Sequence, residues 1–392
     1  MYYIIVSLIA LIGFIIFLLT HHIHQDKLRP HGGPRWKNYL AYLLIKLGSM
    51  KDEDNIKMSQ ANDRIPPLLG KEDENYNDSF VFEGSDNKGN LFMTRLGFRG
   101  DGSRGEIWLW MVLDGIKYVI PVDEDSIQGE TSDKIAAGNL KFTCTDQETG
   151  SFKISYSGPL NDNIKNCTVD VDYKPVSAMY HSGNHIDAMT FGKSMAEMPW
   201  SKEYFENLRS ENQCRIEQGG FLSGTVTLDE KEITIDMHSI RDHSWGKRNW
   251  NFIKRYIWNI ISFEENIVIN KKEYNYMIFT TANYGTTFEH IVSGWIAGND
   301  NVLPIVEGSD MNFCGEDSII PERYTYQFRP KGGPLLDLKI NRSTNDHSWF
   351  TQNKTFEICE AYCSVECSGI KGHGMSEFGY SKQAGYKRKY PL

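Results

Sequence analysis

The chain reads Arg241-Asp242-His243-Ser244-Trp245-Gly246-Lys247-Arg248-Asn249-Trp250 beyond its midpoint, where ion-pairing residues of both signs, an imidazole and two indoles surround one glycine. This stretch follows residues 232–240, EITIDMHSI, in which polar and apolar residues largely alternate. Alternation with a period of two is typical of a β-strand. The sequence therefore predicts a strand that runs into the stretch and ends at a turn near Gly246.

The two faces of this predicted strand carry different chemistry. Successive side chains of a strand point to opposite faces, so Asp242 and Ser244 share one face, and Arg241, His243 and Trp245 share the other. We expect the second face to look into a cavity, with a titratable imidazole beside an aromatic wall. A structural alternative stays open, in which the charged residues pair with neighbouring strands and Trp245 fills a core. The succession Asp-His-Ser is not a catalytic triad, because triad members converge from separate parts of a fold.

Further strand patterns follow one another through the body of the chain. The clearest is a hairpin with strands at 106–113 and 116–120, since Asp114-Gly115 between them tolerates the positive φ of a type I′ turn. Strands that recur at short spacing with turn residues between them indicate an antiparallel sandwich or barrel. With 392 residues, the chain is long enough for two domains with substantial cores.

Two motifs carry a family resemblance. The first is the lead-in Ile216-Glu217-Gln218-Gly219-Gly220-Phe221-Leu222-Ser223-Gly224-Thr225-Val226 followed by the 241–250 stretch, and it resembles the AttH-like superfamily, which includes bacterial carotenoid hydratases (hydroxyneurosporene synthase). The second, Gly372-His373-Gly374-Met375-Ser376-Glu377-Phe378-Gly379, is similar to a segment near the end of many uncharacterised animal-type members. The resemblance covers residues 75 to 380.

The resemblance implies a mainly β fold of two consecutive antiparallel lipocalin-like β-barrel or sandwich domains, with a hydrophobic ligand in the cleft between them. It places His243 and Trp245 at cavity positions of the hydratases, where a nearby aspartate protonates a polyene double bond. This chain departs from that pattern, because Glu264, Glu265 and Glu273 follow the motif but the next aspartate is Asp300. We expect a transmembrane anchor at 1–20, a hinge, amphipathic helix and polar linker at 21–74, and the two β domains at 75–250 and 251–392.

The N-terminal segment predicts a membrane anchor. Residues 2–20 contain no charge and would extend for about 28 Å as a helix, which is enough to cross a bilayer core. Lys27, Arg29, Arg35, Lys37 and Lys46 follow this span, so the positive-inside bias predicts a single-pass protein whose body faces the cytosol, and we expect the membrane to be that of the endoplasmic reticulum. A lumenal or extracellular body is the alternative, since the chain has four N-glycosylation sequons.

The segment 36–47 reads as an amphipathic helix with Trp, Tyr and Lys placed to lie along a membrane interface. A helix packed on the body is an equal alternative. The net charge of −9 argues against a nucleic-acid partner, because phosphate binding needs a basic face. We expect no metal and no cofactor, because the trio Cys359, Cys363 and Cys367 lacks the spacing and the fourth ligand of a zinc site.

Two functions compete at this stage. In the first, the protein is an enzyme of lyase or isomerase type that hydrates, isomerises or cyclises an isoprenoid-like or polyene ligand; in the second, it carries such a ligand without chemistry. A buried carboxylic acid that stays protonated at neutral pH would supply the proton, and Glu377 is the first candidate, followed by Glu217. The predicted catalytic residues are His243, Asp242, Glu377 and Glu217. The predicted ligand-binding residues are Trp245, Arg241, Arg248, Trp250 and Trp258, with Arg241 and Arg248 also balancing the charge of Asp242.

Overall fold

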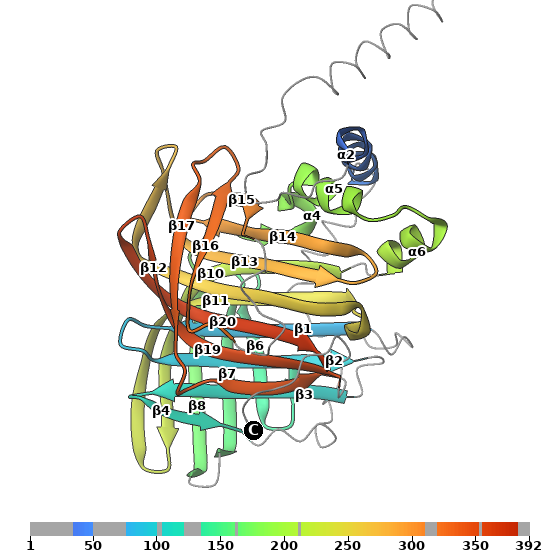
Figure 1. The fold of residues 1–392 in the computed structure, drawn as a ribbon. Helices are drawn as coiled ribbons and strands as arrows, with labels where there is room; N and C mark the ends of the chain where they lie inside the picture. The colour runs from blue at the N-terminus through green and yellow to red at the C-terminus, as the bar shows by residue number, and fades with distance from the viewer. Residues whose placement is uncertain are drawn as a thin grey trace, which may run out of the picture.

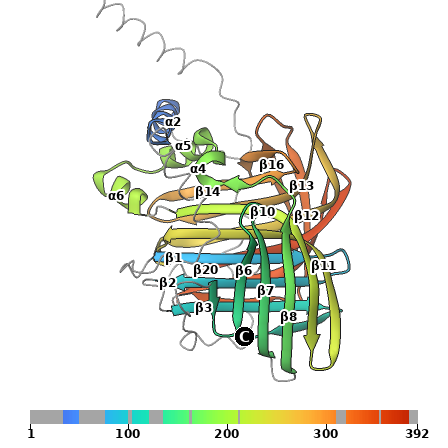
Figure 2. The ribbon, with the colours of Figure 1, turned by 180° about the vertical axis from the view of Figure 1, so that it is seen from behind.

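The structure, a computed structural model, describes residues 34–49, 76–99, 104–120, 135–160, 164–210, 213–309, 320–352 and 355–382. These residues form two large antiparallel β-sheets with a small group of helices at one end (Figure 1, and from behind in Figure 2). The prediction of a mainly β, antiparallel fold is confirmed.

The first sheet has the strand order β4-β3-β2-β1-β11-β10-β8-β7-β6-β5, with the short β9 paired to β10. Its central strands β1, β10 and β11 include the long strand that the alternating pattern predicted. The strands are β1 (Tyr76–Ser85), β2 (Leu91–Arg99), β3 (Arg104–Leu113), β4 (Ile116–Val119), β5 (Ile135–Ala137), β6 (Leu140–Asp146), β7 (Ser151–Leu160), β8 (Ile164–Pro175), β9 (Tyr180–His181), β10 (Gln213–Leu228) and β11 (Lys231–Lys247).

The second sheet has the order β17-β16-β15-β14-β13-β12-β20-β19-β18, and an additional pairing of β17 with β19 closes it into a barrel. A short 3-10 helix, η1 (Trp250–Phe252), connects the two sheets. The strands are β12 (Ile253–Ile269), β13 (Lys272–Tyr284), β14 (Phe288–Ala297), β15 (Val302–Gly308), β16 (Arg323–Pro330), β17 (Leu336–Arg342), β18 (Ser348–Gln352), β19 (Phe356–Cys367) and β20 (Ile370–Ser381).

The hairpin turns follow local backbone preferences. Asp114 and Gly115 have φ values of 53° and 74°, as a type I′ turn requires, and the predicted hairpin of β3 and β4 is confirmed. Ser368 and Gly369 repeat this geometry between β19 and β20, with φ values of 53° and 86°. Because such two-residue turns set the register of the strands that they join, residues far along each hairpin meet predictable partners.

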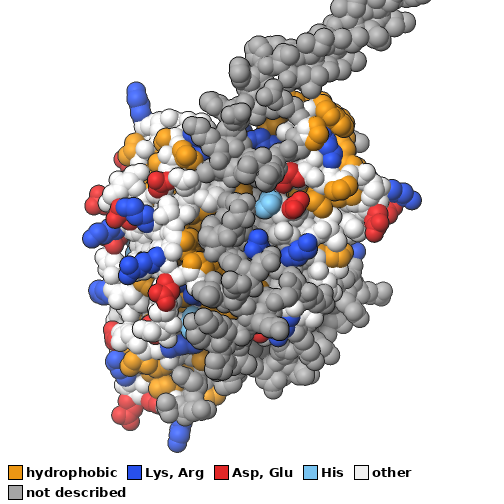
Figure 3. Space-filling view, viewed as in Figure 1, with side chains coloured by type: hydrophobic (Ala, Val, Ile, Leu, Met, Phe, Trp, Pro, Cys, Tyr) orange, Lys and Arg blue, Asp and Glu red, His pale blue; other side chains and the backbone are white. Residues whose placement is uncertain are grey.

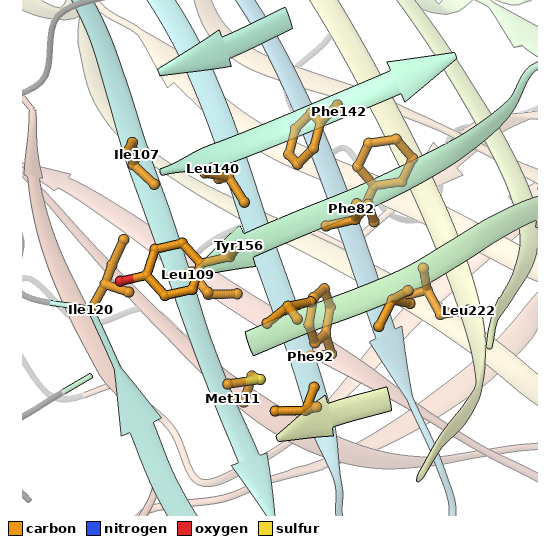
Figure 4. Close-up of a cluster of buried hydrophobic side chains, with 14 of the residues drawn as sticks. Phe82, Phe92, Ile107, Leu109, Met111, Ile120, Leu140, Phe142, Tyr156 and Leu222 are labelled. Atoms are coloured by element: carbon orange, nitrogen blue, oxygen red, sulfur yellow. The ribbon is translucent and has the colours of Figure 1, made fainter. Parts of the chain in front are cut away.

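Three apolar clusters hold the sheets. One fills the concave face of the first sheet, where aromatic rings such as Phe82, Phe142 and Tyr156 interdigitate with leucine and isoleucine side chains (Figure 4). A second fills the barrel of the second sheet around Phe279 and Tyr326. The third joins the two sheets, because it contains Trp110 and Ile240 from the first together with side chains of the second. The interface between the sheets is thus itself a core.

Four helices lie together at one end of the molecule (Figure 1): α2 (Arg35–Ser49), α4 (Ser182–His185), α5 (Ala188–Glu197) and α6 (Lys202–Ser210). The helix predicted at 36–47 is present as α2 and packs on α5, where the backbone of Tyr42 approaches Gly192 so closely that an added Cβ would lie 3.0 Å from its nitrogen. The predicted anchor at 1–20 and most of the predicted linker lie outside the described residues. Among the described helices, none combines the length and the apolar character needed to cross a bilayer.

Candidate functional site

A cavity of about 620 Å³ lies between the two sheets and under the helices. Strands β1, β2, β3, β10 and β11 contribute its lining from the first sheet, and β12, β13, β14, β19 and β20 contribute it from the second. Its walls are rich in aromatic rings, namely Trp108, Tyr180, Phe191, Trp250, Tyr256, Trp258, Tyr284 and Phe288. A cavity of this size with aromatic walls and a few polar groups is the usual form of a small-molecule site.

Strand β11 presents the face of the central motif that we did not expect. The alternation is as predicted, but Asp242 and Ser244 line the cavity whereas His243 and Trp245 lie on the other face. There the ring of His243 stacks on Phe80 at 3.8 Å and its Nε2 lies 2.9 Å from Oδ1 of Asp78. The expectation that the imidazole and the indole look into this cavity is therefore corrected. The second sheet packs against the polar face of β11, so the polar face meets the cavity.

The predicted residue Arg241 also lies away from the cavity. Its guanidinium group is 5.8 Å above the ring of Phe152 in the core of the first sheet, and Nη2 donates to Oε1 of Gln218 at 3.2 Å. Its place as the partner of Asp242 is taken by Arg215 of β10, whose Nε lies 3.0 Å from Oδ2 of Asp242. The sequence analysis missed Arg215, because only the pairing of β10 with β11 brings it to Asp242.

Glu217 and Asp242 form the first of two carboxylate pairs at the cavity. They stand directly opposite each other on β10 and β11, and Nη1 of Arg215 lies 3.3 Å from Oε1 of Glu217. The indole N–H of Trp295, from the second sheet, donates to the other oxygen of Glu217. Burial, opposed by Arg215 and reinforced by Asp242, raises the pKa of Glu217 to about 8. Glu217 thus holds a proton at neutral pH behind Asp242, which itself lines the cavity.

Glu360 and Glu377 form the second pair. They stand directly opposite each other on β19 and β20, and both line the cavity. The indole N–H of Trp110, from the first sheet, donates to Oε2 of Glu360 at 2.6 Å, and the hydroxyl of Tyr256 donates to Oε1 of Glu377. Burial, reinforced by the charge of Glu377, raises the pKa of Glu360 well above its usual range. Burial also raises the pKa of Glu377, against the hydrogen bonds from Tyr256 and Glu360.

The predicted acid Glu377 therefore lies at the cavity, and the structure adds Glu360, which we missed. A signal for it is present in the sequence. Strand β19, the Ser368-Gly369 turn and the Glu377 motif form one hairpin in which Cys367 pairs with Ile370. Glu360 lies seven residues before Cys367 and Glu377 lies seven residues after Ile370, so the same register pairs Glu360 with Glu377.

Arg248, Trp250 and Trp258 complete the predicted residues that line the cavity. The guanidinium group of Arg248 lies 5.3 Å from the ring of Trp250, and that of Arg215 lies 5.6 Å from the ring of Trp258. The structure thus brings together Asp242, Glu377, Arg248, Trp250 and Trp258 on one cavity, with Glu217 behind them. It leaves His243, Trp245 and Arg241 on the opposite face of β11.

Solved structures of other proteins are similar to this architecture. The crystal structure of a protein assigned as AttH from Nitrosomonas europaea superposes with a TM-score of 0.51 and 7% sequence identity, covering 77% of this chain and 92% of that chain. The crystal structure of kievitone hydratase from Nectria haematococca gives a TM-score of 0.48 and 12% identity, covering 81% and 98%. The likeness to the Nitrosomonas protein shows a common fold, so the predicted AttH-like architecture is confirmed.

Sequence comparison gives the family. No curated protein sequence matches this chain. A family model described as "Domain of unknown function (DUF7064)" matches residues 61–381, which include both sheets and the cavity. The chain therefore belongs to the DUF7064 family, and it is built on the AttH-like fold.

Proposed function

We propose that the protein is an acid catalyst that hydrates, isomerises or cyclises an unsaturated, largely apolar ligand held in the cavity between its sheets. The observation that carries this proposal is the pair of facing carboxyl groups of Glu360 and Glu377 on an aromatic-walled cavity. In the part of the chain that the structure describes, their close partners are the donors Tyr256 and Trp110 and not cations. Two buried carboxyl groups without a paired cation retain at least one proton at neutral pH.

The proton of this pair is suited to reach a carbon–carbon double bond. One O–H bond of the pair breaks and a C–H bond forms on the ligand, which leaves a carboxylate on the protein and a carbocation on the ligand. Rings such as Trp258 and Tyr256 line the same cavity, and each stabilises a cation by about 0.5–2 kcal/mol. In hydration, water adds to the cation and loses a proton. In isomerisation the cation loses a neighbouring proton, and in cyclisation an internal double bond adds to the cation and the new cation then loses a proton. In each case the released proton returns to the pair.

A deuterium experiment distinguishes an enzyme from a carrier. The full chain is incubated in deuterated water with a panel of isoprenoid polyenes, and mass spectrometry measures deuterium bound to carbon. We expect incorporation with at least one ligand, and a fall of about 100-fold or more in Glu377→Gln, because general acids contribute that much to rates. Ligand affinity, measured by tryptophan quenching, should stay within about twofold because the amide preserves the shape of the acid.

The matched control for this experiment is Glu366→Gln. Glu366 lies on the same hairpin, but its side chain is largely exposed and pairs with Lys339 at 2.8 Å, so incorporation should be unchanged. Ligand binding without incorporation in the unmodified chain would identify a carrier. Equal incorporation by the unmodified chain and Glu377→Gln would remove Glu377 from the mechanism.

We also propose that the helical end of the molecule rests on a membrane, with the body on the cytosolic side. Helix α2 exposes a stripe of apolar side chains beside the exposed Lys46, with Trp36 at 54% and Leu47 at 62% exposure, and Figure 3 shows apolar side chains gathered in this region. The helices that roof the cavity lie beside this stripe, so an apolar ligand would have a short path from the bilayer. The complete stripe is Trp36, Leu40, Leu43, Leu44 and Leu47.

Two measurements test this placement. Replacing Leu43 and Leu44 by Gln should reduce sedimentation of a chain lacking residues 1–33 with phosphatidylcholine–phosphatidylserine vesicles. Unchanged sedimentation, or none by the parent, would contradict the interfacial role of α2. In microsomes, protease digestion of the body without detergent is expected for a cytosolic body, and protection would place it in the lumen.

A further inference from the structure

Arg248 lines the cavity and, unlike Arg215, forms no ion pair with either carboxylate pair in the described part of the chain. Nε of Arg248 donates to Oε1 of Gln213 at 3.2 Å, and Nη2 donates to Oγ of Ser244 at 3.3 Å. Both acceptors are neutral. In the part of the chain that the structure describes, Arg248 has no carboxylate partner, whereas Arg215 faces Asp242 and Arg95 faces Glu106 at 2.9 Å.

Other cations surround this guanidinium group. Burial and the nearby Arg215, Arg99 and Arg95 lower the pKa of Arg248 to about 10. Arginine is effectively always charged near neutral pH, so the group remains a cation in an unfavourable position. An anion bound beside it would relieve both the burial of the charge and the repulsion from its neighbours.

Arg248 differs in its partners from the other arginines of this part of the cavity. Among the described residues, Glu106 pairs with Arg95 and Arg99, and Asp242 pairs with Arg215. The described hydrogen-bond partners of Arg248 are both neutral, so a ligand anion is the charge that would balance it.

The cavity also provides the hydrogen-bonding groups that an anion needs. Two of the five N–H donors of Arg248 are used by Gln213 and Ser244, which leaves three. Ser79 stands directly opposite Ser244 on β1, and both serines line the cavity. The lining also includes apolar side chains from the helical segment 182–210 and β14, namely Ile186, Phe191, Leu208, Phe288 and Ile291.

We propose that Arg248, with Ser79 and Ser244, binds a carboxylate of the ligand, so that the substrate class is an apolar unsaturated acid and not a neutral hydrocarbon. The planar guanidinium group matches a carboxylate through two parallel hydrogen bonds, which a neutral alcohol cannot reproduce. This inference rests on the cavity being the ligand site of the proposed function, and it does not require that Glu377 be catalytic. The head of the ligand would then lie near the acid pair. The positive charge of Arg248 lowers the pKa of Tyr256, and the hydroxyl of Tyr256 donates to Glu377.

Binding of matched acids and alcohols tests the proposal. The probes are unsaturated fatty acids and the fatty alcohols of identical chain, titrated into the full chain in detergent while tryptophan fluorescence is followed. We expect the unmodified protein to prefer the acid by about tenfold or more, as hydrogen bonds to charged groups provide. In Arg248→Met the acid affinity should fall by about 10- to 100-fold while the alcohol affinity changes less than about threefold.

Two further variants keep the outcome interpretable. Arg248→Lys retains the charge and should recover part of the preference for the acid, which shows that the loss in Arg248→Met is not a loss of fold. Arg323→Met removes an exposed arginine that does not line this cavity, and it should leave the preference unchanged. Equal affinity for acid and alcohol in the unmodified chain, absence of acid binding, an equal loss for both probes in Arg248→Met, or loss of the preference in Arg323→Met would each overturn the proposal. If no deuterium is incorporated but the protein still prefers the acid to the alcohol, only the proposed catalytic activity is overturned.

Discussion

The two carboxylate pairs at the cavity share an arrangement and differ in one neighbour. In each pair two acids face each other across adjacent antiparallel strands, Glu217 with Asp242 and Glu360 with Glu377. In each, a tryptophan from the other sheet donates its N–H to one acid. The first pair also has Arg215, which balances the charge of Asp242, whereas the described residues beside the second pair offer the hydroxyl of Tyr256 in place of a cation.

The difference shows how a single cation separates a structural pair from a proton donor. Arg215 forms an ion pair with the buried Asp242, and this ion pair joins β10 to β11. No described cation forms an ion pair with the second pair, and burial raises the pKa of both of its acids, so a proton is kept and is available to a ligand. The comparison predicts unequal responses of the two pairs to the same kinds of substitution.

Removing the cation of the first pair should have the largest effect on stability. Arg215→Met leaves the charge of Asp242 buried and unpaired, which should lower the free energy of unfolding by about 3 kcal/mol at pH 7. The additional change Asp242→Asn should restore most of this loss, because it removes the unpaired charge. Urea unfolding measures both, and Arg323→Met, at an exposed arginine, should change stability by less than about 0.5 kcal/mol. A loss in the single variant that the double variant does not restore would show that Arg215 acts by packing and not by charge.

The raised pKa of Glu217 predicts an effect on stability that depends on pH and is smaller over any one pH unit. The unfolded chain loses this proton above its ordinary pKa of 4.5, whereas the folded chain keeps it to about pH 8. Because the folded state binds more protons in this interval, stability should fall as pH rises from 5 to 8. Glu217→Gln should make this fall less steep, by at most about 1.4 kcal/mol per pH unit. Unfolding curves at pH 5, 6, 7 and 8 check this, and identical slopes for the variant and the parent would show that Glu217 is ionised at neutral pH.

The two tryptophan donors should give the smallest and most selective effects. Trp110→Phe and Trp295→Phe each remove one hydrogen bond to a carboxyl group, at a cost of about 1 kcal/mol of stability. The hydrogen bond from Trp110 lowers the pKa of Glu360, so its loss should move the decline of deuterium incorporation to higher pH. Trp295→Phe should leave that profile in place. A shift of the profile in both variants, or in neither, would contradict the division of roles between the pairs.

The sequence predicted the fold well because its signals are local. Alternation in residues 232–240 predicted β11, and Asp114-Gly115 predicted the hairpin of β3 and β4. The two-residue turns at Asp229-Glu230 and Ser368-Gly369 also determine the register of their hairpins, since Leu228 pairs with Lys231 and Cys367 with Ile370. This register places the two acids of each carboxylate pair opposite each other. That register was available from the sequence and would have identified Glu360.

The sequence did not show which face of β11 lines the cavity. Alternation separates Asp242 and Ser244 from His243 and Trp245, but it does not say which face meets the second sheet. The apolar character of Trp245 and the titratable ring of His243 favoured the wrong face. The cavity lies instead on the polar side, where residues from β10, β19 and β20 meet Asp242. The partner of Asp242 and the surroundings of Arg248 depend on contacts between distant segments, which one sequence does not specify.

The protonation of the Glu360–Glu377 pair is the central claim and can be observed directly. Infrared spectroscopy of the ligand-free protein at pH 7 detects the C=O stretch of protonated carboxyl groups, which ionised carboxylates lack. We predict such a band in Glu217→Gln, where the first pair no longer contributes. The band should weaken in the triple variant that also carries Glu360→Gln and Glu377→Gln, where Glu83, whose pKa burial also raises well above its usual range, still contributes. A spectrum of Glu217→Gln without the band, or one that the triple variant leaves unchanged, would contradict the account.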